Sequence, residues 1–370
     1  MKKLIFFVLM TSCALAAGQT RNPLKRPFSS HSIWNMPIGS EAVYVPANLP
    51  NYADVTPRPW NPMPQMDDEL IIMHPEVDEV PVARNGTGWN NPNRCVPDGT
   101  TPTLHFKTLP IPPNYTVPNS SKNNSAAVLS KGGRFVYQLQ PLTKCAGLAS
   151  ATALLDFPPV DIYGSGHSGA HGGSGMSAVG GSLRIGELRP GQEPPHHALK
   201  VDVDSVSVMH PCTVKSDCYR WPAYGADSYA AQPGIGYGSK ASVTPPAAMK
   251  MGALLALPPS VDIAKIGLET PPAMMLAWTM QNYGAYIVDS TGGPGFAIAA
   301  ENGPDGNYRD QFKADWNMAF EGWVASNTPW TRDIGRIVVL LSVIDNNALN
   351  SIGGGGIPLQ PLAPEIAPPN

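Results

Sequence analysis

The chain has 370 residues and a net charge of −3, and it is rich in two residue types, with 41 Pro and 36 Gly. Coiled coils and helix bundles need long runs free of both residues, so these classes are excluded. Glycine has no three-residue period, which excludes collagen. No basic cluster is present, as nucleic-acid binding would require. The composition therefore indicates a folded protein with many turns and loops.

The first 16 residues have the pattern of a signal peptide. Lys2 and Lys3 precede an apolar run over residues 4–10, and residues 14–16 have the A-x-A spacing of a cleavage site. The apolar run is shorter than the roughly 20 residues that span a bilayer. We therefore expect a secreted or periplasmic protein without a transmembrane segment. In the alternative interpretation, Cys13 lies in a loose lipobox and carries a lipid anchor.

Four cysteines remain after such a cleavage, and an even number favours two disulfides in an exported chain. Cys212 and Cys218 would close a short loop, and Cys95 would then pair with Cys145. A zinc site built from all four cysteines is the alternative, but the chain has no C-x-x-C spacing.

Proline dominates residues 17–125, where regular helix is nearly impossible. The segment contains Trp34, Trp60 and Trp89, whose exposure to water would be costly. We therefore expect an N-terminal arm that packs on the domain, with short strands such as residues 70–72.

Residues 126–350 are predicted to form a β-rich core with inserted helices, and residues 351–370 an irregular tail. Apolar and polar residues alternate over residues 134–139 and 197–203, and the alternation continues over 205–208. This pattern is typical of antiparallel strands with one buried and one solvated face. The expected fold class is mainly β, with an antiparallel β-sandwich or jelly-roll-like core, a few helices in the C-terminal half and long Pro/Gly-rich loops.

Two helices are predicted in the C-terminal half. Thr270 and the two prolines after it form a helix start, apolar residues recur at helical spacing up to Met280, and Gly284 suits the C-cap. A second helix is expected over residues 310–323. The apolar run 337–344 fits either a buried strand or the end of a helix.

Residues 163–187 hold nine glycines among 25 residues, which lets the backbone approach a ligand closely. We expect this glycine-rich loop to belong to a functional site, with His171 and His197 as catalytic residues. No cofactor is expected, and a metal ion held by His167, His171 and His197 is the weaker alternative. Residues 166–170 resemble a nucleophile elbow, but Ala replaces the last glycine and no helix can easily follow.

Arg184 and Glu187 follow in a strand-like stretch. They are either an ion pair within the sheet or cleft residues, with Arg184 facing an acidic substrate and Glu187 acting as an acid or base.

Residues 218–229 are dense in Tyr, Trp, Arg and Asp. Aromatic faces stack on sugar rings, and arginine binds carboxylates through two parallel hydrogen bonds. We expect Tyr219 and Arg220 to be catalytic. Substrate-binding roles are predicted for Arg184, Glu187, Trp221, Asp227 and Tyr229.

Tyrosine, histidine and arginine together suit β-elimination on a uronate. The arginine neutralises the carboxylate, and Tyr or His removes the α-proton and protonates the leaving oxygen. We therefore expect a secreted carbohydrate-active enzyme, preferably a lyase that cleaves an acidic extracellular polysaccharide. The alternatives are a glycoside hydrolase, with Glu187 and Asp227 as its carboxylate pair, and a non-catalytic carbohydrate-binding or cell-surface protein.

Several long strings resemble a group of exported, mostly bacterial proteins without an assigned reaction. The strings are PFSSHSIWNMPIG, HGGSGMSAVGGSLRIGEL, HHALKVDV, YRWPAYGAD, MGALLALPPSVD, WTMQNYGAYIVD and DNNALNSIGGGG. The resemblance covers about residues 27–364 and implies one continuous domain. It implies no catalytic residue.

Overall fold

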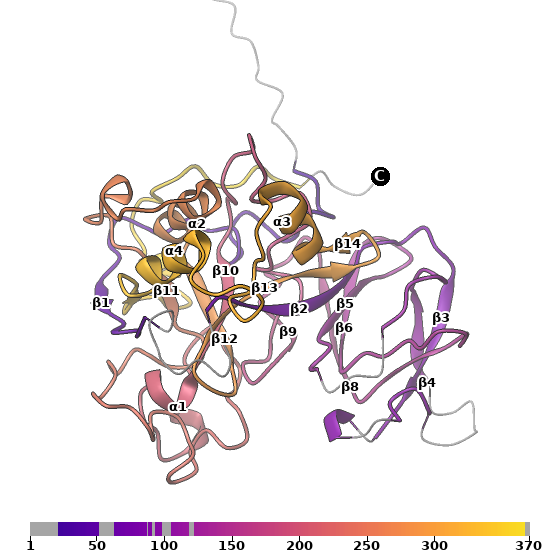
Figure 1. Ribbon diagram of the computed structural model, residues 1–370. Coiled ribbons are helices and arrows are strands. Elements are labelled where there is room, and N and C mark those ends of the chain that lie inside the picture. The colour runs from indigo at the N-terminus through magenta and orange to yellow at the C-terminus, as the bar shows by residue number, and fades with distance from the viewer. Residues whose placement is uncertain are drawn as a thin grey trace, which may run out of the picture.

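The computed structural model describes residues 21–51, 63–86, 88–90, 93–97, 105–117 and 122–366. Most strands in this part of the chain belong to one mixed sheet with the order β1-β15-β11-β12-β10-β13-β2-β5-β6-β8, and β14 pairs with β13 (Figure 1). The strands of the main sheet are β1 (Tyr44–Pro46), β2 (Gln65–Ile72), β5 (Ala126–Leu129), β6 (Phe135–Gln140), β8 (Leu155–Asp161), β10 (Leu199–Val203), β11 (Leu254–Ala256), β12 (Ala285–Ser290), β13 (Phe296–Gly303), β14 (Gly306–Asn307) and β15 (Ser342–Ile344).

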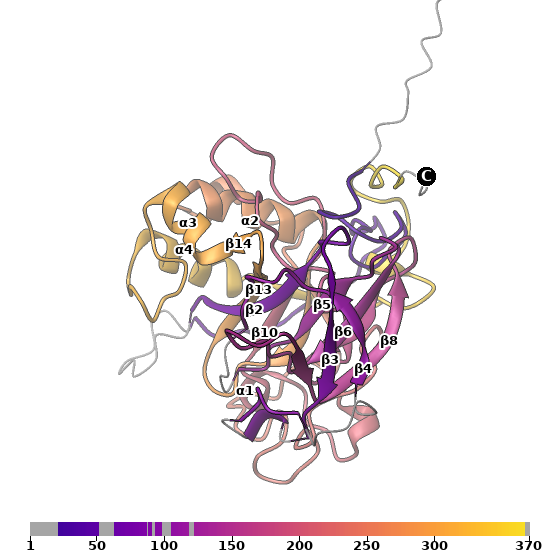
Figure 2. The same ribbon diagram turned by 90° about the vertical axis from the view of Figure 1, so that its right-hand side faces the viewer.

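A second, smaller sheet packs against one end of the main sheet. It contains β3 (Glu79–Arg84), β4 (His105–Pro110) and β7 (Ala151–Ala153) in the order β4-β3-β7. Figure 2 shows β3 and β4 in front of β5 and β6. Strand β5 is buried on both faces: Ala126 and Val128 join Val82 in the apolar cluster between the two sheets, while Ala127 and Leu129 join the main core. The alternation of side chains along a strand explains this division.

Helices α2 (Pro271–Asn282), α3 (Tyr308–Trp316) and α4 (Pro329–Val338) lie together on one side of the molecule, and α1 (Ser205–Val208) lies at the opposite end (Figure 1). Short helical turns are η2 (Gly88–Asn90), η4 (Lys215–Asp217), η5 (Ile263–Lys265) and η6 (Ile352–Gly354). Helix α2 begins after Thr270 with proline in its first turn, as predicted, but the hydroxyl of Thr270 does not cap the helix and donates to Asp333 instead. Helix α3 ends at Trp316, earlier than predicted, because Asn317 adopts a left-handed conformation. The run 337–344 contains both the end of α4 and β15.

The predicted class, mainly β with a few helices, is confirmed. The main sheet is mixed rather than purely antiparallel, since β10 is parallel to β12 and β2 is parallel to both β13 and β5.

Two local predictions are corrected. Residues 205–208 form α1, with Ser205 and Val208 buried, because an S-V-S-V pattern also fits one helical turn. Strand β10 is buried along its whole length, on both faces, so its polar residues Lys200 and Asp202 do not face water.

The proline-rich segment contributes to the sheets as well as to loops. Strand β2 lies between β13 and β5 in the main sheet, and Trp34 is buried, whereas Trp60 lies outside the described residues. The division of the chain at residue 125 stays a prediction.

Both predicted disulfides are present, Cys95–Cys145 and Cys212–Cys218. Disulfides indicate an oxidising compartment. Within the described residues, no helix has the length and apolarity to cross a membrane. The predicted signal peptide and Cys13 lie outside the described part of the chain.

Candidate active site

Charged side chains gather on one face of the main sheet where β10, β13 and β2 run side by side. Asp67 of β2 lies opposite Ala299 of β13, and Asp202 of β10 lies opposite Ala297. The small alanine side chains leave space above β13, so that side chains of the two flanking strands reach each other. Together with His171 they form what we call the charged cluster: Asp67, Glu69, His171, Lys200 and Asp202.

A β-bulge brings a further carboxylate next to this cluster. The register of β10 against β12 shifts between Val201 and Asp202, so Asp202 pairs with Asp289 instead of Val288. A one-residue shift changes which side chain faces a given neighbour, and bulges commonly re-aim side chains beside active sites. The shift therefore places Asp289 beside Asp202.

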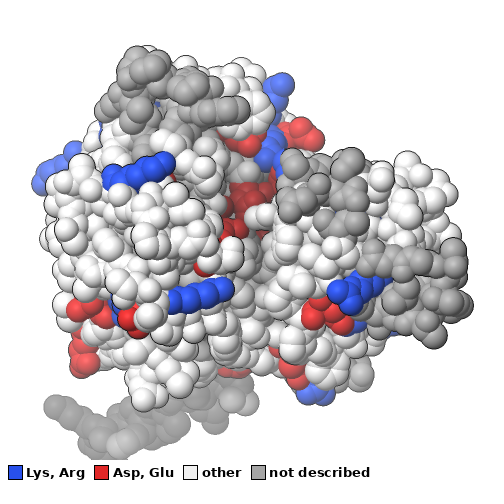
Figure 3. Space-filling view, turned by 90° about the horizontal axis from the view of Figure 1, so that it is seen from below, with Lys and Arg blue, Asp and Glu red and all other residues white. Residues whose placement is uncertain are grey.

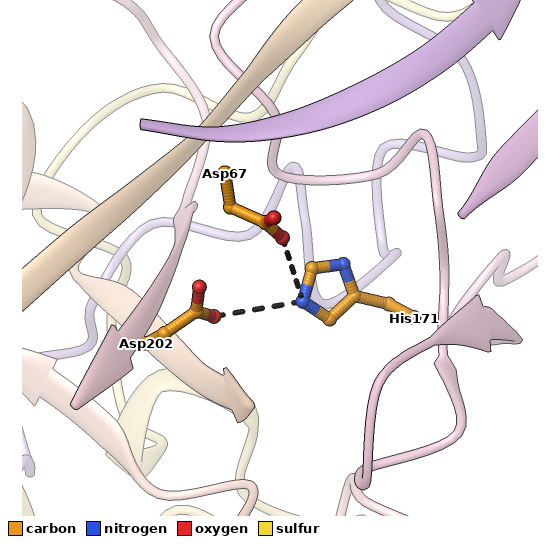
Figure 4. Close-up of side chains that lie close together, drawn as sticks. All are labelled: Asp67, His171 and Asp202. Carbon is orange, nitrogen blue, oxygen red and sulfur yellow. Dashed lines mark ion pairs between the residues drawn. The ribbon is translucent and has the colours of Figure 1, made fainter. Parts of the chain in front are cut away.

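His171 ends the short strand β9 (Ser168–His171) and is 1% exposed. Its Nδ1 contacts Oε1 of Glu69, and Nζ of Lys200 donates to the same oxygen at 2.5 Å. Its Nε2 lies 3.5 Å from Oδ2 of Asp67 and 3.5 Å from Oδ1 of Asp202 (Figure 4). Within the described part of the chain, neither Nε2 of His171 nor Oδ1 of Asp202 has a hydrogen-bond partner.

Burial and mutual charge set the protonation of the cluster. Burial, with the nearby charge of Asp202, raises the pKa of Asp67 well above its usual value. Burial alone would raise the pKa of Glu69, but Lys200 and His171 hold it below its usual value. Burial alone would lower the pKa of His171, but the charge of Glu69 raises it well above 6.5. The cluster thus contains an ionised Glu69 held between Lys200 and His171.

A cleft of about 660 Å³ lies beside the charged cluster. The aromatic residues of its lining are Trp89, Phe157, Tyr224 and Tyr229. The polar and charged residues include Asn123, Gln140, Lys215, Asp227 and Asp289. Asn123 also lines a smaller cavity of about 250 Å³ that includes Asp67 and Asp68. Seen from below, the molecule has a hollow between its two halves with Asp and Glu side chains at its bottom (Figure 3).

Two glycines of the glycine-rich loop allow the backbone to lie against the cleft carboxylates. Gly172 has a φ of +38°, and a Cβ atom added there would lie 2.0 Å from Oδ2 of Asp289. A Cβ atom added at Gly173 would lie 2.8 Å from Oδ1 of Asp227. The backbone N–H of Gly173 points to Oδ1 of Asp289 at 3.3 Å. Here glycine provides the close approach that the sequence suggested.

Asp227 and Asp289 differ in their surroundings. Asp227 accepts a hydrogen bond from the hydroxyl of Tyr237 at 2.7 Å, and burial raises its pKa, an effect that this bond offsets in part. Asp289 accepts hydrogen bonds from N–H of Ser290 at 2.8 Å and from Nδ2 of Asn123 at 3.2 Å. Burial, followed by the charge of Asp227, raises the pKa of Asp289 to about 7. Two neighbouring carboxyl groups with different environments can serve as an acid and a base.

Three of the sequence-predicted residues lie at this site: His171 in the cluster, and Asp227 and Tyr229 in the cleft wall. His167 lies at the rim, where its Nδ1 is 2.8 Å from Oγ of Ser165 and its Nε2 contacts the hydroxyl of Tyr224.

A second group of predicted residues lies elsewhere and is internally satisfied. Nε2 of His197 is 3.0 Å from Oε1 of Glu187, and its Nδ1 is 2.9 Å from the carbonyl of Ala198. Arg184 donates to Oε2 of Glu301 at 2.8 Å. The cavity beside Arg184 and His197 measures about 20 Å³, room for about one water. We call this the His197 site.

The remaining predicted residues do not line the cleft. Arg220 donates to the backbone carbonyls of Asp345, Asn347 and Ala248, so its guanidinium braces the C-terminal loop. Tyr219 and Trp221 are partly buried against the core.

Several residues of the site were missed by sequence reasoning, namely Asp67, Glu69, Lys200, Asp202 and Asp289. A signal existed for Asp289, the one charged residue of the mostly apolar strand AYIVDS, whereas QMDDELII is half polar and the alternating LKVDV also fits a strand with one solvated face. Charged residues are rarely buried unless they are paired, so a strand such as AYIVDS points to a buried charged group.

No protein-family model, curated protein or solved structure matches this chain significantly.

Proposed function

We propose that the protein is an exported glycoside hydrolase that cleaves an extracellular polysaccharide in the cleft. The observation that carries the proposal is that Asp227 and Asp289 line the same cleft of about 660 Å³ together with Trp89, Tyr224 and Tyr229. Paired carboxyl groups provide the chemistry of glycosidic bond cleavage, and aromatic faces stack on sugar rings.

Asp289 is the proton donor in this proposal. Burial and the charge of Asp227 keep its carboxyl protonated near neutral pH, so it can protonate the leaving glycosidic oxygen. Asp227, with a hydrogen bond from Tyr237 that favours its ionised form, acts as the base or nucleophile. These roles require no residue from the His197 site.

The charge of the site favours a neutral polysaccharide over a uronate. Among the described residues that line the cleft, Lys215 is the single basic side chain and arginine is absent. The carboxylate of Asp227 lies in the cleft wall and would repel an acidic chain. A lyase on an acidic polysaccharide therefore has less support than the hydrolase.

One observation still favours the lyase. Tyr224 lies in the cleft wall, and its hydroxyl contacts Nε2 of His167, which forms a Tyr–His pair suited to proton abstraction. The two reactions give different products, because elimination leaves an unsaturated sugar that absorbs ultraviolet light and hydrolysis does not.

The test is a panel of neutral and acidic polysaccharides, assayed in parallel for reducing sugars and for ultraviolet absorbance. We expect reducing ends without ultraviolet absorbance. Asp289→Asn and Asp227→Asn should each lower kcat by about 10²–10⁴-fold. The matched control is Asp315→Asn, which removes an ion pair with Arg189 and changes no residue of the cleft lining.

Two outcomes would overturn the proposal. Ultraviolet-absorbing product would establish the lyase, with Tyr224→Phe as the decisive variant. Binding to a polysaccharide without product from any substrate would establish a carbohydrate-binding protein.

A further inference from the structure

The histidine of the charged cluster has one nitrogen whose role no contact within the described protein explains. The contact of its Nδ1 with ionised Glu69 assigns the Nδ1 hydrogen to that bond, so in the neutral imidazole the Nε2 lone pair is directed toward Asp67 and Asp202. A lone pair and two carboxylate oxygens that face one another repel unless a positive charge lies between them.

A proton is one candidate for that charge, but the distances do not suit it. A charge-assisted N–H···O hydrogen bond contracts to about 2.7–2.9 Å. Both distances from Nε2 are 3.5 Å. A metal ion bound tetrahedrally at about 2.1 Å holds its ligand atoms about 3.4 Å apart. The measured separations therefore match the edges of a metal coordination shell better than a hydrogen bond.

We propose that Asp67, His171 and Asp202 bind a divalent transition-metal ion of the zinc type. Their ligand atoms all lie within 4.8 Å of one another (Figure 4). One imidazole nitrogen with two carboxylate oxygens suits Zn²⁺, whereas Ca²⁺ takes six to eight oxygen ligands. This proposal is independent of the proposed hydrolase activity.

The surroundings have the features of a built metal site. Glu69 holds the far nitrogen of the histidine, as a carboxylate commonly does for a metal-bound imidazole, and Lys200 holds Glu69 in place. The side chain of Asp67 is 28% exposed and lines the cavity of about 250 Å³, which gives an ion a path from solvent. Three protein ligands leave a fourth position free for water or substrate.

The test is zinc binding to the full mature protein after treatment with EDTA and removal of any affinity tag. Isothermal titration should give one equivalent of Zn²⁺. Cobalt(II) should produce visible absorption bands of a four- or five-coordinate site, and excess Ca²⁺ should not displace either ion. Asp67→Asn and Asp202→Asn should each weaken zinc binding at least about 100-fold, because loss of a mere supporting residue already costs 10–100-fold.

His197→Gln and Asp227→Asn are the matched controls, since one is a buried histidine with a glutamate partner and the other is a cleft aspartate outside the ligand group. Both should bind zinc like the wild-type protein. Substitution of the buried ligand, as in His171→Gln, can prevent folding. Asp67 is partly exposed, so Asp67→Asn tests the site even in that case. The proposal is wrong if the wild-type protein binds no zinc, or if both aspartate variants bind it unchanged, as an ion at His74 and Asp305 would.

Discussion

The charged cluster and the His197 site contain the same pair of residue types in different circumstances. Each has a buried histidine next to a glutamate: His171 with Glu69, and His197 with Glu187. Both nitrogens of His197 have protein partners, and the adjacent cavity holds about one water. One nitrogen of His171 has carboxylates at 3.5 Å instead, next to a large cleft. A His–Glu pair alone therefore does not point to a functional site, and the case for the charged cluster depends on the nitrogen without a partner in the described part of the chain and the cleft beside it.

The largest effect is expected from removing the buried cation of the charged cluster. Lys200 is fully buried, and its Nζ donates to Glu69 at 2.5 Å and to the carbonyl of Ser177 at 2.8 Å. Loss of one partner of a buried ion pair costs about 3–5 kcal/mol. We expect Lys200→Met to lower the free energy of unfolding by about that amount in urea denaturation.

The control is Arg332→Met, which breaks a half-exposed pair with Glu269 and should cost about 0–1 kcal/mol. Equal losses in the two variants would mean that Glu69 is not ionised in the folded protein, and the contrast between the two histidine sites would lose its electrostatic basis.

Alanine substitution at two glycines compares the two regions, because only one of the added Cβ atoms would meet a neighbouring atom. Gly172 and Gly186 both have positive φ, at +38° and +105°, so alanine is strained at each by about 1–2 kcal/mol. At Gly172 the new Cβ would also lie 2.0 Å from Oδ2 of Asp289, whereas at Gly186, next to Glu187, nothing lies within 4 Å. We expect Gly172→Ala to lose activity in excess of its loss of stability, and Gly186→Ala to lose stability only.

These two variants are compared by their turnover rates at a temperature where both remain folded, with thermal unfolding as the second measurement. If Gly186→Ala slows turnover as much as Gly172→Ala does, the glycine-rich loop does not act through Asp289.

A smaller effect is expected at the other histidine. His197→Gln removes the contact of Nε2 with Glu187, a carboxylate that is largely buried, and should cost about 1–3 kcal/mol. The measurement is urea denaturation, accompanied by the turnover rate of the folded variant. If turnover slowed by about 100-fold, as loss of a general acid or base would cause, without loss of structure, His197 would return to the catalytic role that the sequence suggested.

The sequence predicted those features that depend on local signals or on counting. The start of α2 follows from the prolines after Thr270, and the two disulfides follow from four cysteines and one short loop. The charged cluster could not be predicted in this way, because β2, β9 and β10 are far apart in the chain. An alternating strand such as HALKVDV has the same pattern whether Lys200 and Asp202 face water or face other charges. The bulge that pairs Asp202 with Asp289 has no sequence signature either. The glycine density near His171 and the aromatic segment that contains Asp227 and Tyr229 both pointed to the correct region.

The most gradual expected effect is in the pH dependence of stability, where the two regions should have opposite signs. The pKa of Asp289 is raised from 3.8 to about 7, so the folded protein binds the additional proton, and stability falls as pH rises from about 4 to 7. Burial would raise the pKa of Glu187, but His197 holds it below 4.5, so its contribution is present above pH 4.5 and is lost as pH falls through its folded pKa. One titrating group changes stability by at most about 1.4 kcal/mol per pH unit.

We expect Asp289→Asn to flatten the fall of stability between pH 4 and 7, and Glu187→Gln to flatten the loss of stability on the acid side. The measurement is urea denaturation with EDTA present. An Asp289→Asn curve parallel to that of the wild-type protein from pH 4 to 7 would remove the assignment of Asp289 as the protonated acid, while leaving the zinc proposal to its own test.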